Sequence, residues 1–389
     1  MGIRIVVALA LLNQIAFKGS KMLVALHAIE LGARPFSLGL LISAYACVPL
    51  LLSVHAGRVS DRFGACRPMI AGSFGTSAGL LLPVAMPTLP ALYASATLIG
   101  IANVYFHVAA HKLVGSLGDG AKRTHNFGLF SLGAAVSAFV APLVVGGAID
   151  ARGHIAAYLL LAAVCVLPGF LLLRRERGLA TPPAAREAVG TGGVFALLAD
   201  ADLRRTYVVS GLVLTGVELF GFYAPVYGKS LGFSASAIGV LLATQAAAAF
   251  VVRLWMPQLA GRFGEEPVLA ASLLVAGATY LLFPLFDDLA MLVAIAFVLG
   301  LGLGCGQPLS VVLTYNRSPA GRAGEALGLR VTVNKATQIV IPVAFGSLGA
   351  ATGVLPVFWG SAALLLLGGW LCARGGGGRA NECRKSSGI

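Results

Sequence analysis

Twelve apolar runs, most of them separated by only a few residues, constrain this chain more than any other feature. Their approximate limits are 5–31, 36–56, 68–87, 90–114, 124–149, 154–173, 206–228, 234–257, 267–286, 289–314, 325–350 and 354–373. Each is near the roughly 20 residues that a helix needs to cross a bilayer. Only 11% of the residues are charged, against about 25% in soluble domains. The sequence therefore predicts an all-α membrane protein with 12 transmembrane helices.

The positive charges of the chain, whose net charge is +13, are distributed unevenly about these runs. On one side lie Arg34, Arg152 and Lys229. Within the runs lie Lys18, Lys21, Arg330 and Lys335. The other lysines and arginines fall on the opposite side, and such loops are cytoplasmic. We expect a multi-pass protein of the cell inner membrane with both termini cytoplasmic. The basic excess then sets topology and attracts anionic lipid, and it does not indicate nucleic-acid binding.

One long polar stretch interrupts the apolar pattern at 174–205, where several arginines and prolines gather. We interpret it as a cytoplasmic linker between an N-terminal six-helix bundle, 1–173, and a C-terminal six-helix bundle, 206–373. The tail at 374–389 is rich in glycine and charge and has no apolar face. We expect that tail to be disordered and cytoplasmic.

The two halves share landmarks at an offset of 200 residues. Arg62-Phe63-Gly64 matches Arg262-Phe263-Gly264. The other matched sets are Leu31-Gly32 with Leu231-Gly232, Gly39 with Gly239, Gly100 with Gly300, Gly128-Leu129 with Gly328-Leu329, and Pro142 and Gly146 with Pro342 and Gly346. A repeat of this kind predicts two bundles of one topology, related by a pseudo-twofold axis along the membrane normal.

A charged stretch joins the second and third runs, from 57 to 68, and glycines suit a sharp turn there. It resembles the G-x-x-x-D-R-x-G loop between helices 2 and 3 of the major facilitator superfamily. The matching residues are Gly57, Asp61, Arg62 and Gly64. The basic run that usually follows is reduced to Arg67, and an ordinary cytoplasmic turn would also be positive. Together with the repeat and the twelve runs, the resemblance covers roughly residues 5 to 373.

This resemblance implies a secondary transporter that works by alternating access. Helices 1, 4, 7 and 10 would line a central cavity, and helices 2, 5, 8 and 11 would form the moving interface. Ala141-Pro142 and Gly146-Gly147 further resemble the G-P-x-x-G-G motif of the drug/proton antiporters of this superfamily, with departures at Ala141 and Val145. We expect Pro142 and Gly146, like the four residues of the charged turn, to take part in conformational gating. Plain helix packing is the alternative.

Among the fifteen carboxylates, only Glu218 falls in the middle of a predicted span. An ionisable group at that depth is costly and is a functional candidate by default. We predict that Glu218 is a proton-coupling residue. Its repeat equivalent is Lys18, and Lys21 shares a helix face with Lys18. A structural ion pair between Glu218 and one of these lysines is an alternative, as is simple exposure to a wet cavity.

Three deep cations, Lys18, Lys21 and Lys335, outnumber that one deep carboxylate. The imbalance predicts an anionic substrate, unless some lysines are neutral and the cavity takes neutral or amphipathic compounds. On the eleventh span, Arg330, Asn334 and Gln338 are spaced by four and share a face, with Lys335 off that stripe. Arg330 lies near the helix end and can also snorkel to the surface or pair with Glu325. The remaining substrate-binding candidates are Gln307, Tyr223 and Asn13.

The fourth span carries His107 and His111, one helical turn apart. His107 is a candidate second proton site or substrate contact, and a packing histidine is the alternative. No third metal ligand accompanies the pair, and the six cysteines are scattered, so we predict no metal and no cofactor.

The alternating glycines from Gly300 to Gly306 resemble a nucleotide-binding loop, but no strand precedes them. We interpret them as sites of close helix packing. No Walker, G-x-S-x-G or H-E-x-x-H motif is present, so we do not expect an enzyme. We expect a monomer that moves a small organic molecule with protons, favouring efflux by antiport, with proton-coupled uptake of an organic anion as the alternative. A membrane sensor or a membrane-embedded enzyme would be the competing class.

Overall fold

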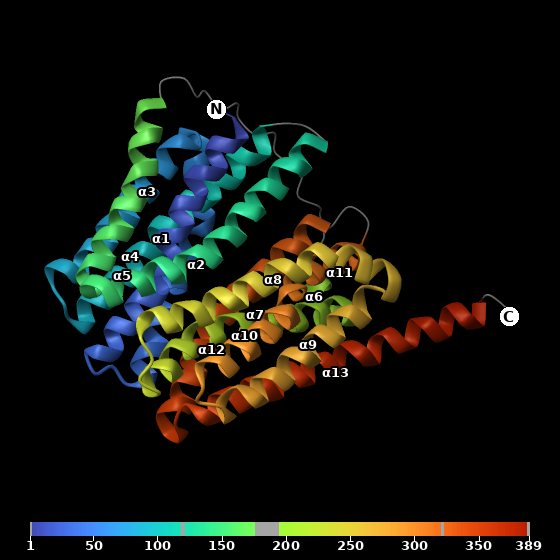
Figure 1. The fold of residues 1–389 in the computed structure, drawn as a ribbon. Coiled ribbons are helices and arrows are strands. Elements are labelled where there is room, and N and C mark those ends of the chain that lie inside the picture. Colours follow the sequence, from blue (N-terminus) through green and yellow to red (C-terminus); the bar gives the residue numbers. More distant parts are fainter. Residues whose placement is uncertain (1, 118–120, 176–193, 320–322, 387–389) are drawn as a thin grey trace. The chain divides into compact units, whose positions relative to one another are not determined.

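The computed structural model describes residues 2–117, 121–175, 194–319 and 323–386, and these are helical almost throughout (Figure 1). Most of the predicted linker and the end of the tail lie outside the described residues, as does the side chain of Asp61. The described residues form two compact units. The first unit holds those up to 175, with 222–243 and 342–347. The second holds 194–221, 244–341 and 348–386.

Five helices run through the first unit. They are α1 (Ile3–Glu30), α2 (Pro35–Phe63), α3 (Cys66–Ala85), α4 (Leu89–Ser116) and α5 (Ala121–Arg175). Helix α1 packs against α4 and α5, and α3 packs between α4 and α5 (Figure 1). A core of fully buried side chains, including Val6, Met69 and Phe106, joins α1, α3 and α4. Helix α5 covers two predicted spans. Gly153, with φ of 80°, bends the chain between them.

The later helices form the second unit. Parts of them, residues 222–243 and 342–347, belong to the first unit. They are α6 (Val194–Ala199), α7 (Ala201–Ser230), α8 (Ala235–Phe263), α9 (Glu265–Leu282), the 3₁₀ turn η2 (Phe283–Leu285), α10 (Leu289–Gly304), α11 (Gly306–Arg317), α12 (Ala323–Thr352) and α13 (Leu355–Ser386). Helix α9 packs against α10 and α13. Helix α13 continues past residue 373, where the sequence predicts the last span to end. The predicted division into two bundles, a linker and a tail stays a prediction.

Ten stretches of the described helices are long and apolar enough to cross a membrane. They account for eleven predicted spans, because the stretch Leu129–Arg174 passes Gly153 and covers two. Helix α12 is the remaining predicted span. It is 30 residues long, but the polar stripe that begins at Arg330 lowers its hydropathy. The predicted set of twelve membrane helices is therefore present in the described chain.

The internal repeat recurs in the backbone. Among the described residues, positive φ angles occur at six glycines that form three pairs 200 residues apart: Gly32 and Gly232, Gly64 and Gly264, Gly153 and Gly353. Glycine adopts this left-handed conformation without steric cost, so each pair marks a turn that both halves need. The pair at 153 and 353 was not recognised from the sequence.

Close helix crossings also repeat at this offset. A Cβ on Gly100 would lie 2.5 Å from the carbonyl oxygen of Tyr45, and a Cβ on Gly300 would lie 2.3 Å from that of Gln245. Gly302 and Gly304 are confined by backbone atoms of α9 and α8 in the same way. The interpretation of these glycines as helix-packing positions is confirmed.

The predicted turn at 57–68 is shorter than expected. Helix α2 continues through Gly57 to Phe63, and the turn is confined to Gly64 and Ala65. A glycine inside a helix costs only about 1 kcal/mol, and a charged helix end can project beyond the apolar layer. The prediction that Gly57 opens a turn was therefore wrong.

Helix α10 ends at Gly304 and α11 begins at Gly306, in the middle of one predicted span. Pro308 explains the interruption, because it has no N–H to donate to the carbonyl of Gly304 four residues earlier. Arg253 of α8 donates its Nε–H to that carbonyl instead, at 2.9 Å. The break places Gln307 and Ser310 in the first turns of α11.

Candidate functional site

Glu218 is part of a hydrogen-bonded chain inside the second unit. Gln338 Nε2 donates to Glu218 Oε1 at 3.0 Å, and Lys335 Nζ donates to Gln338 Oε1 at 3.0 Å. All three side chains are half-buried. One amide thus links the carboxylate of α7 to the ammonium of α12. Lys335 lies off the stripe of residues spaced by four, but it is three residues before Gln338, and that spacing also lets the two side chains meet.

Arg330 lies at the centre of a second polar cluster. Its Nη2 donates to Gln307 Oε1 at 2.6 Å and to Ser310 Oγ at 2.8 Å. Asn334 Nδ2 donates to the same Gln307 oxygen at 3.3 Å, and Ser210 Oγ donates to Asn334 Oδ1 at 3.0 Å. Arg330 is only 6% exposed, so the suggestion that it snorkels to the surface was wrong.

Helix α12 therefore presents Arg330, Asn334 and Gln338 toward α7 and α11, as their spacing by four predicted. The hydrogen bonds of Arg330 within the described chain go to neutral oxygens of Gln307 and Ser310. None of these described contacts is with a carboxylate, and the side chain of Glu325 lies outside the described residues. A guanidinium is a donor group that can bind an anion through charge-assisted hydrogen bonds.

The predicted cations of the first unit lie on α1. Lys18 Nζ donates to the carbonyl oxygen of Ala134 on α5 at 2.5 Å. Lys21 Nζ lies 5.6 Å from the ring centroid of Phe17, in a cation–π contact. Both lysines are half-buried. The predicted pairing of Glu218 with either lysine stays a prediction.

Two other predicted residues occupy packed positions. Asn13 is fully buried and donates to Cys165 Sγ at 3.3 Å. Tyr223 is 1% exposed, and its ring packs edge-on against Phe222 with centroids 4.6 Å apart. These positions favour helix packing for both residues over direct contact with a solute.

His107 is half-buried on α4 beside a second histidine. Its ring centroid lies 4.3 Å from that of His111 and 5.8 Å from that of Phe130. His111 Nδ1 lies 3.0 Å from the carbonyl oxygen of His107. Among the described side chains, no group of three or more His, Cys, Asp or Glu gathers at metal-binding distance.

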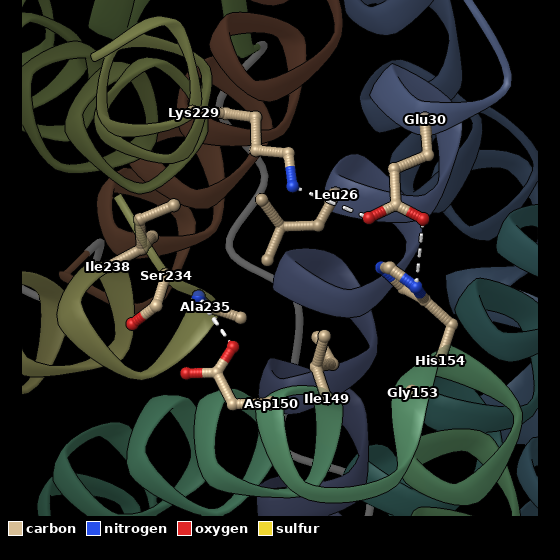
Figure 2. A pocket seen from close by; sticks show the side chains of 10 residues that line it. All are labelled: Leu26, Glu30, Ile149, Asp150, Gly153, His154, Lys229, Ser234, Ala235 and Ile238. Atoms are coloured by element: carbon tan, nitrogen blue, oxygen red, sulfur yellow. Dashed lines mark hydrogen bonds and ion pairs between the residues drawn. The ribbon is translucent and has the colours of Figure 1, made fainter. Parts of the chain in front are cut away.

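The structure adds a polar site that sequence reasoning missed, around a cavity of about 320 Å³ in the first unit (Figure 2). Asp150 of α5 accepts from the backbone N–H groups of Ala235 and Ser236 at 2.9 and 2.8 Å. Ser234 Oγ accepts from the N–H of Ala237 at 3.2 Å. The first N–H groups of α8 have no partner inside their own helix, so Asp150 and Ser234 together cap it.

Glu30 forms the other side of this cavity (Figure 2). Its Oε1 lies 3.4 Å from Lys229 Nζ, and its Oε2 lies 3.1 Å from His154 Nδ1. The ring of His154 stacks on His27 with centroids 5.1 Å apart. Glu30, His154 and Lys229 occupy helix ends, where Lys229 is also accounted for as a topology charge. The detectable signal was the spacing by four of Pro142, Gly146 and Asp150 on one face of α5.

Two glycines bring α5 and the start of α8 into backbone contact beside Asp150. A Cβ on Gly146 would lie 2.4 Å from the carbonyl oxygen of Ala235. A Cβ on Gly239 would lie 2.5 Å from the carbonyl oxygen of Pro142. The close approach expected of the glycine–proline segment is therefore present. Its gating role stays a proposal.

Comparisons with known proteins agree with this architecture. The pattern described as Major Facilitator Superfamily matches residues 6–211 and 206–377. The class C tetracycline resistance protein of Escherichia coli is 25% identical over 329 residues, covering 81% of this chain and 80% of that protein. The 4-hydroxybenzoate transporter PcaK of Acinetobacter baylyi is 28% identical over 192 residues, covering 45% of this chain and 38% of that protein.

A crystal structure of the nucleoside transporter NupG has the same fold. Its TM-score is 0.81 at 14% identity, and the match covers 96% of this chain and 99% of that one. The family pattern spans nearly all of the twelve membrane helices, and the relatives named above are transporters rather than enzymes. This chain belongs to the Major Facilitator Superfamily and is a multi-pass membrane protein that acts as a secondary transporter.

Proposed function

We propose that this transporter exchanges protons for a small organic anion by alternating access, and exports that anion across the cell inner membrane with both termini in the cytoplasm. The observation that carries the proposal is the hydrogen-bonded chain Glu218–Gln338–Lys335. It joins an acid, able to take up and release a proton, to a cation, able to hold an anion.

The amide of Gln338 couples the two events in this proposal. With Glu218 ionised, the NH₂ end of the amide faces the carboxylate and the oxygen end accepts from Lys335. A protonated Glu218 can donate a hydrogen bond, and in this proposal the amide oxygen turns toward Glu218 and away from Lys335. Protonation would thereby change the anion affinity of Lys335. Each proton crossing with the potential supplies about 2.3 kcal/mol per 100 mV.

Arg330 and the lysines supply the positive charge for the substrate. Arg330 is buried among neutral acceptors, and Lys18 is held by a backbone carbonyl. The similarity to a transporter of 4-hydroxybenzoate, a carboxylate, supports an anionic substrate. The similarity to tetracycline resistance proteins supports export.

Alternating access requires one side of the bundle to close while the other opens. We assign the closed contact to the crossing at Pro142, Gly146 and Asp150, where backbones touch and a helix end is capped. The charged end of α2, with Gly57, Asp61, Arg62 and Gly64, would gate the opposite side. His107 remains a candidate second proton site.

The test is flux in proteoliposomes under an imposed pH gradient, with 4-hydroxybenzoate and tetracycline as the two probes. We expect Glu218→Gln to abolish gradient-driven accumulation and substrate-induced proton movement, while exchange of labelled for unlabelled solute continues. Glu265→Gln is the matched control, because this second-unit carboxylate bonds the amide of Asn316 at the end of α11. The coupling assignment would be refuted if the Glu218→Gln variant moved as many protons as the unmodified protein.

The substrate assignment has its own test. We expect Lys335→Gln and Arg330→Gln each to weaken binding of 4-hydroxybenzoate by at least tenfold. Unchanged binding in both would refute the anion site. Coupled uptake of the anion is the second candidate, and the similarity to a 4-hydroxybenzoate transporter fits transport in either direction. Accumulation in right-side-out vesicles, and not in inverted ones, would establish it over export.

A further inference from the structure

An apolar groove of about 550 Å³ opens on the second unit, between α8, α9 and α10. Its lining includes Leu259, Phe263, Val268, Val275 and Leu301. The one hydroxyl of the lining, Ser272 Oγ, donates to the carbonyl oxygen of Gly302 at 2.5 Å. The hydrogen of that hydroxyl is therefore engaged inside the protein, and the mostly apolar lining suits a hydrocarbon chain.

Small residues create the groove. Ala271, Gly302 and Cys305 lie along it. At the position equivalent to Cys305 in the first half stands Tyr105, whose hydroxyl lies 2.6 Å from His55 Nδ1. The repeat thus keeps a bulky, hydrogen-bonded side chain in one half and leaves an open space in the other.

A positive charge stands at one end of the groove. The guanidinium of Arg262 lies 5.2 Å from the ring centroid of Phe263, which lines the groove. Arg262 is exposed. The carboxylates that follow it are already engaged: Glu265 by Asn316, and Glu266 by Arg317. A planar guanidinium in such a position binds phosphate oxygens in pairs.

We propose that this groove is a binding site for an anionic phospholipid, with one acyl chain against α9 and the phosphate on Arg262. The apolar length and the terminal charge match the two parts of such a molecule. Anionic lipids are concentrated in the cytoplasmic leaflet, and the α8–α9 turn is predicted to be cytoplasmic. The proposal does not depend on proton coupling or on the identity of the solute.

The chain carries a reporter for this site. Trp255 lies three residues after Val252 and four before Leu259, so it shares their face of α8, and it is 58% exposed. The chain has three tryptophans, so Trp359→Phe with Trp370→Phe leaves Trp255 alone. Its quenching by lipids brominated on the acyl chain reports occupancy of the groove.

The experiment titrates brominated phosphatidylglycerol and brominated phosphatidylcholine into the purified protein. We expect half-maximal quenching at a mole fraction at least threefold lower for phosphatidylglycerol. Arg262→Gln removes this preference, whereas Arg62→Gln preserves it, because Arg62 stacks identically on Phe63 in the other half. Ala271→Phe, which fills the groove, weakens quenching by both lipids. Ala278→Phe, seven residues along the same exposed face of α9, leaves it unchanged.

Equal half-maximal quenching by the two lipids would overturn the proposal. Loss of the preference in Arg62→Gln as well as Arg262→Gln would also overturn it, because general surface charge would then explain the effect. Displacement of the brominated lipid by 4-hydroxybenzoate or tetracycline, with loss of transport in Ala271→Phe, would assign the groove to the solute instead.

Discussion

Two helix crossings in the first unit are copies of each other, and they differ in one respect. At the first, α5 meets the start of α8 through Gly146 and Gly239. At the second, the 342–347 segment of α12 meets the start of α2, where a Cβ on Gly39 would lie 2.3 Å from the carbonyl oxygen of Pro342. The backbone contact is duplicated. The polar contact is not, because only the first crossing has an acid, Asp150, on the facing helix.

The two helix starts explain this difference. Helix α2 begins with Pro35, which has no N–H, and its preceding residue Arg34 makes no side-chain cap. Helix α8 begins with Ala235 and Ser236, whose N–H groups are both taken by Asp150. The duplicated glycines and prolines thus carry the packing, and the asymmetric acid adds a contact that the second crossing lacks.

The largest effect is expected at the shared backbone contact. Gly146→Ala places a methyl group 2.4 Å from a carbonyl oxygen, and overpacking of this kind costs about 1–3 kcal/mol. We expect transport to fall at least tenfold. Labelling of a single cysteine introduced at Ile149, beside the cavity, should rise as this side opens.

Two variants sharpen that result. Gly147→Ala is the control, because a Cβ there would meet nothing within 4 Å, and it should transport normally. Gly346→Ala should have a smaller effect than Gly146→Ala, since its nearest atom would be 3.1 Å away. An equal loss of transport in Gly346→Ala and Gly146→Ala would mean that transport depends as strongly on the second crossing as on the first.

Loss of the acid comes next in size. Asp150→Ala removes a cap of the kind worth about 0.5–2 kcal/mol, so we expect a two- to thirtyfold rise in the labelling rate at Ile149. Ala235→Pro makes α8 begin as α2 does and removes one of the two N–H donors. It should give a smaller rise, of about threefold. An effect of Ala235→Pro larger than that of Asp150→Ala would contradict the capping role.

The smallest effect is expected at the rim of the cavity. Lys229 and Glu30 are each 43% exposed, and exposed ion pairs contribute about 0–1 kcal/mol. Lys229→Gln should therefore change labelling at Ile149 by at most about fivefold, with the difference disappearing at high salt. A large change in labelling that persists in high salt would mean that this ion pair contributes as much to closure as Asp150 does.

The membrane helices were predictable because apolar length alone specifies them, and the repeat followed from glycine and proline positions. The end of α2 was not predictable, because the charged part of a helix that leaves the bilayer looks like a loop in a hydropathy pattern. Helix breaks inside apolar runs were also missed. Pro308 marks one of them, but a proline in an apolar run is compatible with a simple kink.

The candidate site was predictable in part. The spacing of Arg330, Asn334 and Gln338 gave the polar face of α12, because side chains four apart share a face. The hydrogen bond from Lys335 to Gln338 was not anticipated, because side chains three residues apart can also meet. Asp150 was overlooked for a different reason: its partners are backbone N–H groups of a helix 85 residues away, and backbone donors leave no mark in a sequence.

The interruption between α10 and α11 has a mechanical consequence. In an unbroken helix, any sharp bend breaks some of the backbone hydrogen bonds that run along the helix. Here the carbonyl of Gly304 is already held by Arg253, on a different helix. Flexing at Cys305 therefore costs no hydrogen bond at that carbonyl. The segment can serve as a hinge that keeps Gln307 and Ser310 in place while the rest of the span tilts.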